Sequence, residues 1–428
     1  MRKIGWWKTA CAVCVLCAAT AVALPAQTFT TLLNFDNTDG ATPFAGLIQA
    51  TDGNLYGTTL AGGASSSCSY SEASGCGTVF KITPNGTLTR LYSFCSQGNC
   101  TDGADPEGEL LQTADGNFYG TTYLGGANGS CDDLGCGTVF EISPTGRLAT
   151  LYNFCSQNNC TDGAEPDGGL IQAADGNLYG TTRFGGANVS YGGTVFKITR
   201  GGMLITLYSF CSQFDCSDGE NPTGTLIQAT DGNFYGTTAF GGANEACEGS
   251  GCGTVFKITP SGTFTTLYSF CSESQCQDGA VPLGGLMQAK DGNFYGTTEE
   301  GGIHAWGTVF KITPSGTVTT LHKFDSDDGA LPFAGLIEGT DGNFYGTTYS
   351  GGYGFGTVFQ VSASGALSTV QLEPTFDPHQ FSQKFTEYRS QYASYIQQVK
   401  NDLLRTRSLE ERVQSELDQK LQGEIEER

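Results

Sequence analysis

The stretch DGNFYGTT at residues 231–238, followed by GTVFKIT at residues 253–259, occurs in six closely similar copies along the chain. The first landmark, Asp-Gly-Asn-(Leu/Phe)-Tyr-Gly-Thr-Thr, begins at Asp52, Asp115, Asp175, Asp231, Asp291 and Asp341. The second landmark, Gly-Thr-Val-Phe, begins at Gly77, Gly137, Gly193, Gly253, Gly307 and Gly356. Successive first landmarks are 63, 60, 56, 60 and 50 residues apart, which indicates tandem repeats whose loops vary in length while their strands do not.

Each copy contains four runs that are typical of β-strands. In the copy from Gly224 to Phe270 these runs are TLIQA, NFYGTT, GTVFKIT and TFTTLYSF. Asp231-Gly232 separates the first two and Pro260-Ser261-Gly262 separates the last two, and both are turn sequences in which glycine supplies a positive φ. Four antiparallel strands repeated six times predict an all-β, six-bladed β-propeller, because such blades bury their faces only against one another. A seven-bladed propeller and an open β-solenoid are the alternatives.

The chain has one fourth-strand sequence more than it has copies. Residues Phe29 to Phe35, FTTLLNF, match the fourth strand alone and precede the first copy. The last copy also contains its own fourth strand, Ala366 to Leu372. We predict that the repeat domain covers residues 28–373, and the sequence leaves open which of these two strands is surplus.

Residues 1–26 have the pattern of a secretory signal peptide. Basic residues precede an apolar stretch from Ala10 to Leu24, and small residues precede Gln27. The apolar stretch is shorter than the roughly 20 residues that a membrane span requires. We therefore expect cleavage after Ala26 or Ala23, and a bacterial protein that is secreted or held at the cell surface, without a transmembrane segment in the mature chain.

The charge of the chain limits its partners. The formal net charge is −22, and the region between Gln27 and Glu373 contains ten basic and 33 acidic residues. A body this acidic repels nucleic acid and anionic lipid, so we expect no nucleic-acid partner. Cations are the more plausible small ligands.

The cysteines that follow the signal peptide occupy two kinds of loop. Loops after the fourth strand contain Cys95/Cys100, Cys155/Cys160, Cys211/Cys216 and Cys271/Cys276, and loops before Gly-Thr-Val-Phe contain Cys68/Cys76, Cys131/Cys136 and Cys247/Cys252. Each such loop has two cysteines or none, which predicts a disulfide within each loop, as in other exported proteins. Zinc binding is the alternative, disfavoured because the chain has three histidines and the sequence indicates no larger cysteine cluster.

Acidic loops between the copies are candidate calcium sites, and no other cofactor is predicted. Their aspartates are Asp36, Asp39, Asp102, Asp105, Asp325, Asp327 and Asp328. Calcium takes six to eight oxygen ligands, and aspartate-rich loops on a rigid sheet supply some of them. The alternative is that these Asp-Gly sequences only form turns.

Two sets of aromatic residues are candidate ligand contacts. The tyrosine of every first landmark is either a sugar-binding platform or, as we favour, a core residue that packs between blades. Residues that differ between copies are better candidates, and these are His304, Trp306, Tyr353 and Phe355. No nucleophile motif accompanies the histidines and no carboxylate pair is distinctive, so no catalytic residue is assigned.

The C-terminal residues 376–428 differ in composition from the repeats. Apolar residues recur at three- and four-residue spacing from Phe381 to Leu403, and Ser408 with Glu411 forms a capping box before a second apolar series. This pattern predicts a helical tail. Its helices self-associate as a coiled coil, pack on the propeller or remain solvated.

The YGTT…GG…GTVF pattern resembles the GloVer (Gloeobacter–Verrucomicrobium) tandem repeat of exported "choice-of-anchor" proteins over residues 28 to 372. The resemblance implies an exported repeat protein, usually held at the cell surface by a C-terminal sorting signal, without an assigned activity. A Pro-Glu-Pro motif, LPxTG and a terminal apolar helix are missing here, which leaves anchoring open. We expect a non-catalytic scaffold that binds an extracellular polymer or protein through variable loops. A secreted carbohydrate-active lyase or hydrolase is the alternative.

Overall fold

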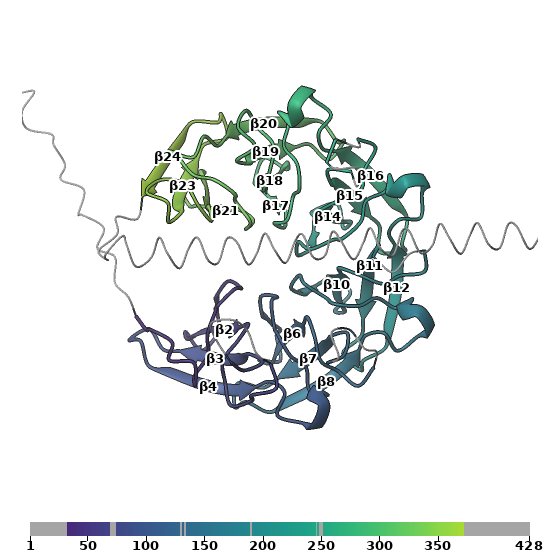
Figure 1. Cartoon of the computed structure of the whole chain (residues 1–428), viewed down its shortest axis with the longest axis vertical. Coiled ribbons are helices and arrows are strands. Elements are labelled where there is room, and N and C mark those ends of the chain that lie inside the picture. Colours follow the sequence, from purple (N-terminus) through teal and green to yellow (C-terminus); the bar gives the residue numbers. More distant parts are fainter. Residues whose placement is uncertain are drawn as a thin grey trace, which may run out of the picture. The chain divides into compact units, whose positions relative to one another are not determined.

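The protein is described by a computed structural model that covers residues 32–68, 74–128, 131, 134–188, 191–244, 246–247 and 251–371. These residues form six four-stranded antiparallel sheets, which confirms the predicted six-bladed β-propeller (Figure 1). The predicted signal peptide and the predicted helical tail lie outside the described residues. Within the described ranges, no helix combines the length and apolar character that a membrane span requires.

The chain divides into two compact units, each described by itself. Of the described residues, those within 32–212, Glu220–Gln228 and Thr259–Thr263 belong to the first unit, and those within Gln213–Gly219, Ala229–Ile258 and 264–371 belong to the second. Blade 1 has β1 (Ile48–Gln49), β2 (Leu55–Thr59), β3 (Thr78–Ile82) and β4 (Leu88–Ser93). Blade 2 has β5 (Leu111–Gln112), β6 (Phe118–Thr122), β7 (Thr138–Ile142) and β8 (Leu148–Asn153). Blade 3 has β9 (Ile171–Gln172), β10 (Leu178–Thr182), β11 (Thr194–Ile198) and β12 (Leu204–Ser209).

The remaining blades follow the same order. Blade 4 has β13 (Ile227–Gln228), β14 (Phe234–Thr238), β15 (Thr254–Ile258) and β16 (Phe264–Ser269). Blade 5 has β17 (Met287–Gln288), β18 (Phe294–Thr298), β19 (Thr308–Ile312) and β20 (Val318–Lys323). Blade 6 has β21 (Ile337–Glu338), β22 (Phe344–Thr347), β23 (Thr357–Val361) and β24 (Leu367–Gln371). Short 3-10 helices follow four of the fourth strands: η1 (Gly98–Cys100), η3 (Asn158–Cys160), η4 (Phe214–Cys216) and η5 (Ser274–Cys276).

The first strand of each blade is shorter than the predicted five-residue run. In blade 3 only two residues pair with the second strand, Ile171 with Tyr179 and Gln172 with Leu178. Just upstream, the Gly169 N–H donates a hydrogen bond of 2.9 Å to the Thr225 hydroxyl of the following copy. The backbone before β9 therefore bonds to its neighbour instead of extending its own ladder.

The second and third strands bring the two sequence landmarks together. In blade 3 the Thr182 and Thr194 hydroxyls are 2.9 Å apart, and the Thr182 hydroxyl also accepts a hydrogen bond from the Thr194 N–H. Both threonines are fully buried. Because buried hydroxyls need partners, this pair explains why the last Thr of YGTT and the Thr of GTVF occur together in every copy.

The repeated tyrosines pack in the core, which confirms the packing interpretation over the ring of sugar platforms for five of them. Tyr56, Tyr119, Tyr179, Tyr235 and Tyr295 are at most 1% exposed. Tyr56 stacks on Phe118 of the next blade with ring centroids 4.2 Å apart, and Tyr295 stacks on Phe344 at 3.9 Å. Stacked aromatic pairs thus join neighbouring blades.

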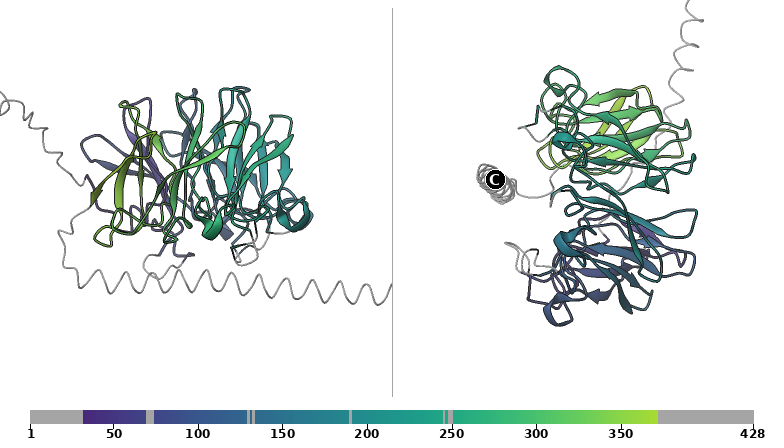
Figure 2. Two further views of the ribbon diagram at one scale, coloured as in Figure 1. Left: turned by 90° about the horizontal axis from the view of Figure 1, so that it is seen from above. Right: turned by 90° about the vertical axis from the view of Figure 1, so that its right-hand side faces the viewer.

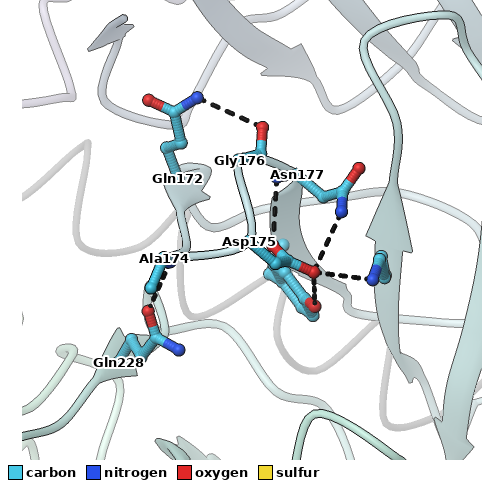
Figure 3. A network of polar contacts seen from close by, with 8 residues as sticks. Gln172, Ala174, Asp175, Gly176, Asn177 and Gln228 are labelled. Atoms are coloured by element: carbon cyan, nitrogen blue, oxygen red, sulfur yellow. Dashed lines mark hydrogen bonds and ion pairs between the residues drawn. The ribbon is translucent and has the colours of Figure 1, made fainter. Parts of the chain in front are cut away.

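The Asp-Gly-Asn landmark is a hydrogen-bonded turn that also joins two blades (Figure 3). The Asp175 carboxylate accepts hydrogen bonds from the Asn177 side chain (2.9 Å) and the buried Tyr179 hydroxyl (2.9 Å), and it lies 2.7 Å from the Lys197 ammonium. The preceding Ala174 N–H donates to the Gln228 side chain of the next copy at 2.8 Å. These contacts explain the repeated Asp-Gly-Asn as structural.

The segment before the first copy contacts blade 1 in the same way as the fourth strand of one blade contacts the next blade. The Phe35 ring meets Phe80 edge-on at 5.1 Å, and Phe154 meets Phe196 in the same way at 5.2 Å. Leu32 lies against Gly86, as Leu151 lies against Gly202. Blade 6 is completed by its own fourth strand, β24. Residues 32–35 therefore cover part of the first blade, although they are not in a strand.

Candidate functional site

The two long loops of each blade lie at the same end of its sheet. One loop connects the second and third strands, and the other leads from the fourth strand to the next blade. Because neighbouring strands run in opposite directions, both of these connections lie at the same end of the strands. Figure 2 shows the 3-10 helices of the fourth-strand loops at the ends of their blades.

A backbone bridge connects these loops in the same way in several blades. The residue after Thr-Thr donates its N–H to the carbonyl of the residue before proline: Leu60 to Thr42 at 3.0 Å, Tyr123 to Asp105 at 2.8 Å, Arg183 to Glu165 at 3.0 Å, Glu299 to Val281 at 2.9 Å and Tyr349 to Leu331 at 3.0 Å. The residue after proline and the residue after Thr-Thr are here called the variable pair of a blade. The variable pairs of these blades are Phe44/Leu60, Glu107/Tyr123, Asp167/Arg183, Leu283/Glu299 and Phe333/Tyr349. One backbone geometry thus presents five chemically different pairs.

Blades 2 and 3 bring together a charged trio formed by Glu107, Asp167 and Arg183. The Arg183 guanidinium is 3.7 Å from the Asp167 carboxylate, and these side chains are 23% and 17% exposed. Burial raises the pKa of Glu107 well above its ordinary value, and the charge of Asp167 raises it further, while the charge of Arg183 lowers it. Burial also raises the pKa of Asp167, against the lowering effects of Arg183 and of a hydrogen bond with Glu107. The trio therefore places two carboxyl groups, each with a raised pKa, beside a cation.

The trio is not needed for the fold. The equivalent residues are Phe and Leu in blade 1, and Leu and Glu in blade 5, on the same backbone bridge. Removing charges from water is unfavourable unless they are paired and hydrogen-bonded, and apolar residues of similar size are often more stable. A charged trio at positions where other blades have apolar side chains is the pattern expected of a site that acts on a ligand.

In the second unit the variable pairs have different chemistry. Burial raises the pKa of Glu299 to about 7, and the neighbouring Glu300 contributes to this shift. In blade 6 the Phe333 and Tyr349 rings lie 5.1 Å apart, and Tyr349 is 41% exposed. Blade 5 therefore presents a carboxyl group that is largely protonated below neutral pH, and blade 6 presents an aromatic pair in which Tyr349 is exposed and Phe333 is partly buried.

The four residues predicted to contact a ligand lie in the second-to-third-strand loops of blades 5 and 6. His304 and Tyr353 are exposed, Tyr353 by 57%. Trp306 packs against the core cluster that contains Phe324 and Phe359, and Phe355 is partly buried. Trp306 thus contributes to the core, whereas His304 and Tyr353 remain ligand candidates.

The acidic loops are held together by hydrogen bonds from the protein. The fully buried Asp102 carboxylate accepts hydrogen bonds from the Tyr92 hydroxyl, the Ser96 N–H and hydroxyl, and the Gln97 N–H, at 2.7 to 3.2 Å. In the loops without cysteines, Asp36 and Asp325 accept N–H groups of the turns that end in Asp39 and Asp328. Asp327 donates its N–H to Asp325, and Asp105 precedes the proline of blade 2. These contacts give the aspartates a structural role in the turns.

The cysteines form the local disulfides that the loops predict. The bridges are Cys68–Cys76, Cys95–Cys100, Cys131–Cys136, Cys155–Cys160, Cys247–Cys252 and Cys271–Cys276, and Cys211 and Cys216 are disulfide-bonded as well. The expectation that the cysteines form no larger cluster is wrong. The sulfur atoms of Cys76, Cys95 and Cys100 lie within 4.8 Å of one another, because the two kinds of loop meet at one end of the blade.

A known family of sequence repeats matches most of the residues that form these blades. The Gloeobacter/Verrucomicrobia repeat matches residues 66–290 and 246–403. The chain belongs to this family. No curated protein matches the chain.

Solved structures similar to this repeat protein include two bacterial lactonase structures. One is a putative 6-phosphogluconolactonase from Bacteroides uniformis, with 14% identity over 77% of this chain and 84% of that chain and a TM-score of 0.46. The other is a gluconolactonase from Xanthomonas campestris, with 13% identity over 78% of this chain and 88% of that chain and a TM-score of 0.42.

Reasoning from the sequence did not find the charged trio. Its members lie in two copies of the Gloeobacter/Verrucomicrobia repeat, and Glu107 and Asp167 are 60 residues apart. The signal was nevertheless present, since aligned copies differ in chemical type at the residue after proline and at the residue after Thr-Thr. Variation against a constant backbone identifies these positions.

Proposed function

We propose that this repeat protein is an exported, non-catalytic binding scaffold whose variable pairs contact an extracellular polymer. One observation carries the proposal. The same backbone bridge presents a charged trio across blades 2 and 3, a carboxyl group in blade 5 and an aromatic pair in blade 6. Side chains needed only for folding would be as constant as the Asp-Gly-Asn turns.

The chemistry of the variable pairs favours a polyhydroxylated ligand such as a polysaccharide. Carboxylates accept hydrogen bonds from sugar hydroxyls, and the Arg183 guanidinium donates to them from five N–H groups in a rigid fork. The exposed ring of Tyr349, with the partly buried Phe333 beside it, offers an apolar surface to the C–H face of a sugar ring. The net negative charge of the repeat region favours neutral or cationic polymers over anionic ones.

The loop disulfides support an exported location. Disulfides form and persist in oxidising compartments and are rare in the cytosol of mesophiles. Seven loops of this chain contain two cysteines each. Together with the signal peptide predicted from residues 1–26, they fit a protein that functions outside the cytoplasm.

A glycan array that includes peptidoglycan fragments, probed with the mature full chain, tests the proposal. We expect saturable binding to one class of polymer, with a loss of at least tenfold in affinity for Asp167→Asn combined with Arg183→Leu. Lys197→Met is the matched control, since it removes a charge from the opposite end of blade 3 and should bind as wild type. Wild-type binding by the double variant would refute a role for the trio.

A secreted carbohydrate-active enzyme is the second candidate, and Glu299 is the observation that favours it. A carboxyl group with a pKa of about 7 is suited to act as a general acid at neutral pH. The Glu107–Asp167 pair fits this alternative less well, because glycosidase carboxyl groups are separated by about 5 to 9.5 Å and these two are in hydrogen-bond contact. Release of reducing ends or of unsaturated products that Glu299→Gln abolishes would establish the enzyme.

A further inference from the structure

Three blades each bring four cysteines from two loops to one place. The sulfur atoms of Cys76, Cys95 and Cys100 lie within 4.8 Å of one another, and Cys68 is bonded to Cys76. In blade 2 the equivalent group is Cys136, Cys155 and Cys160, and Cys131 is bonded to Cys136. In blade 4 it is Cys247, Cys252 and Cys276, and Cys271 is bonded to Cys276. These sets are here called the four-cysteine clusters.

The spacing of the clusters along the chain is regular. In blades 2 and 4 it reads Cys-x4-Cys-x18-Cys-x4-Cys, and in blade 1 only the first interval is longer. Pairs of cysteines separated by 15 to 20 residues are a spacing seen in zinc sites. A cysteine pair before Gly-Thr-Val-Phe occurs only in blades that also have a pair after the fourth strand. If each disulfide only stabilised its own loop, the presence of one pair would not depend on the presence of the other.

The backbone holds the clusters in place without help from the disulfides. The Cys76 carbonyl accepts the Asp105 N–H at 2.9 Å, and the Cys100 carbonyl accepts the Gly126 N–H at 2.9 Å. The cysteine-free loops make the same two bonds, from Leu331 to Trp306 at 2.9 Å and from Gly352 to Ser326 at 2.7 Å. Reduction of the bridges therefore leaves the loop backbones, and with them the four sulfur atoms, close together.

We propose that each four-cysteine cluster is a redox-controlled metal site, with two disulfides when oxidised and one soft cation of the zinc class bound by four thiolates when reduced. A tetrahedral site with metal–sulfur bonds of 2.3 Å places its sulfur atoms about 3.8 Å apart. In each cluster three sulfur atoms lie within 4.8 Å of one another and the fourth is bonded to one of them, so side-chain rotation after reduction can bring the four to this distance. The acidic repeat region attracts the cation, and the bound cation neutralises part of the thiolate charge.

The conversion is balanced as follows. Two equivalents of a small dithiol reduce the two disulfides of a cluster to four thiols, with transfer of four electrons and four protons, and each dithiol becomes a cyclic disulfide. The metal ion then displaces the thiol protons as it binds the four sulfur atoms. Oxidation by a disulfide of suitable potential reverses the process and releases the ion.

Titration of the reduced, full-length mature chain with Cd²⁺ under anaerobic conditions tests the proposal. Sulfur-to-cadmium charge-transfer absorption should saturate at three ions per chain, and at two for Cys136→Ser. The double variant Cys211→Ser/Cys216→Ser should still bind three ions, since blade 3 has no second pair. The oxidised chain should bind none.

A second readout separates a folded site from adventitious thiol binding. Cd²⁺ should raise the midpoint of thermal unfolding of the reduced protein, or restore its fold if reduction alone unfolds it, because only binding to the native state stabilises that state. Absence of saturation, a stoichiometry unchanged by Cys136→Ser, or binding without any effect on the unfolding midpoint would each overturn the proposal.

Discussion

Replacement of Phe35 by Ala tests whether the segment before the first copy supports blade 1. The Phe35 ring packs edge-on against Phe80, at the same distance as the fully buried Phe154 packs against Phe196. Truncation of a fully buried phenylalanine costs about 3 to 5 kcal/mol. Phe35 remains partly exposed, so we expect about half this loss, about 2 kcal/mol, for Phe35→Ala and about 4 kcal/mol for Phe154→Ala.

The assay is thermal unfolding followed by circular dichroism, with Phe214→Ala as the control. Phe214 is 87% exposed, so its truncation should leave the midpoint unchanged. For a cooperative unit of about 200 residues, 1 kcal/mol shifts the midpoint by roughly 2 to 4 °C, which predicts a decrease of roughly 4 to 8 °C for Phe35→Ala. A decrease as small as that of the control would refute the view that residues 32–35 stand in for a preceding blade. A decrease as large as that of Phe154→Ala would show that the segment is buried more completely than its exposure indicates.

Three further predictions concern the buried charges. Asp162→Ala removes the acceptor of the Tyr152 hydroxyl, the Ser156 N–H and hydroxyl, and the Gln157 N–H. The free energy of unfolding measured in urea should therefore fall by about 3 kcal/mol. Glu273 is exposed, so the control variant Glu273→Ala should leave the free energy of unfolding almost unchanged. The pKa of Glu299 is raised to about 7 from an unfolded value near 4.5, so the native state binds more protons and stability falls as pH rises from about 4.5 to 7. By pH 8 the loss should reach about 3 kcal/mol, and Glu299→Gln should abolish this dependence in urea titrations at several pH values. In blade 4 the residue after proline is Thr223 and the residue after Thr-Thr is Ala239. Asp167→Thr with Arg183→Ala introduces these residue types into blade 3 and should change stability by at most about 1 kcal/mol, whereas Arg183→Ala alone should lower it by about 1 to 2 kcal/mol at pH 8. Equal losses would contradict the Asp167–Arg183 pairing.

The repeats carried enough information to predict the fold because each landmark has a local physical cause. Asp-Gly-Asn closes a turn through its own hydrogen bonds, and the two threonines of YGTT and GTVF meet across adjacent strands. Both contacts lie within one blade, so the period of the sequence is also the period of the structure. The all-β propeller and the number of blades follow from these local rules.

Features that depend on two copies were not predictable in the same way. In blade 3 a hydrogen bond from Gly169 to Thr225 of the next copy lies just before the first strand. The charged trio joins side chains from blades 2 and 3, and each four-cysteine cluster joins two loops that are 18 residues apart. Periodicity within one copy contains no information about which loops of a blade, or which neighbouring copies, bring their side chains into contact.

The repeated architecture provides its own control for separating structural from functional residues. Where six copies share a side chain, as at Tyr179 or Asp175, packing and turn geometry account for it in the blades where it is buried or bonded within the turn. Where the backbone is equally constant but the side chains differ, as at Arg183 and Glu299, folding cannot explain the choice of residue, because other blades fold with different ones. The same comparison applies to the cysteines, since blades without them keep the same loop hydrogen bonds. The charged trio and the four-cysteine clusters are therefore additions to a fold that is already complete, and this is the reason to test both for activities of their own.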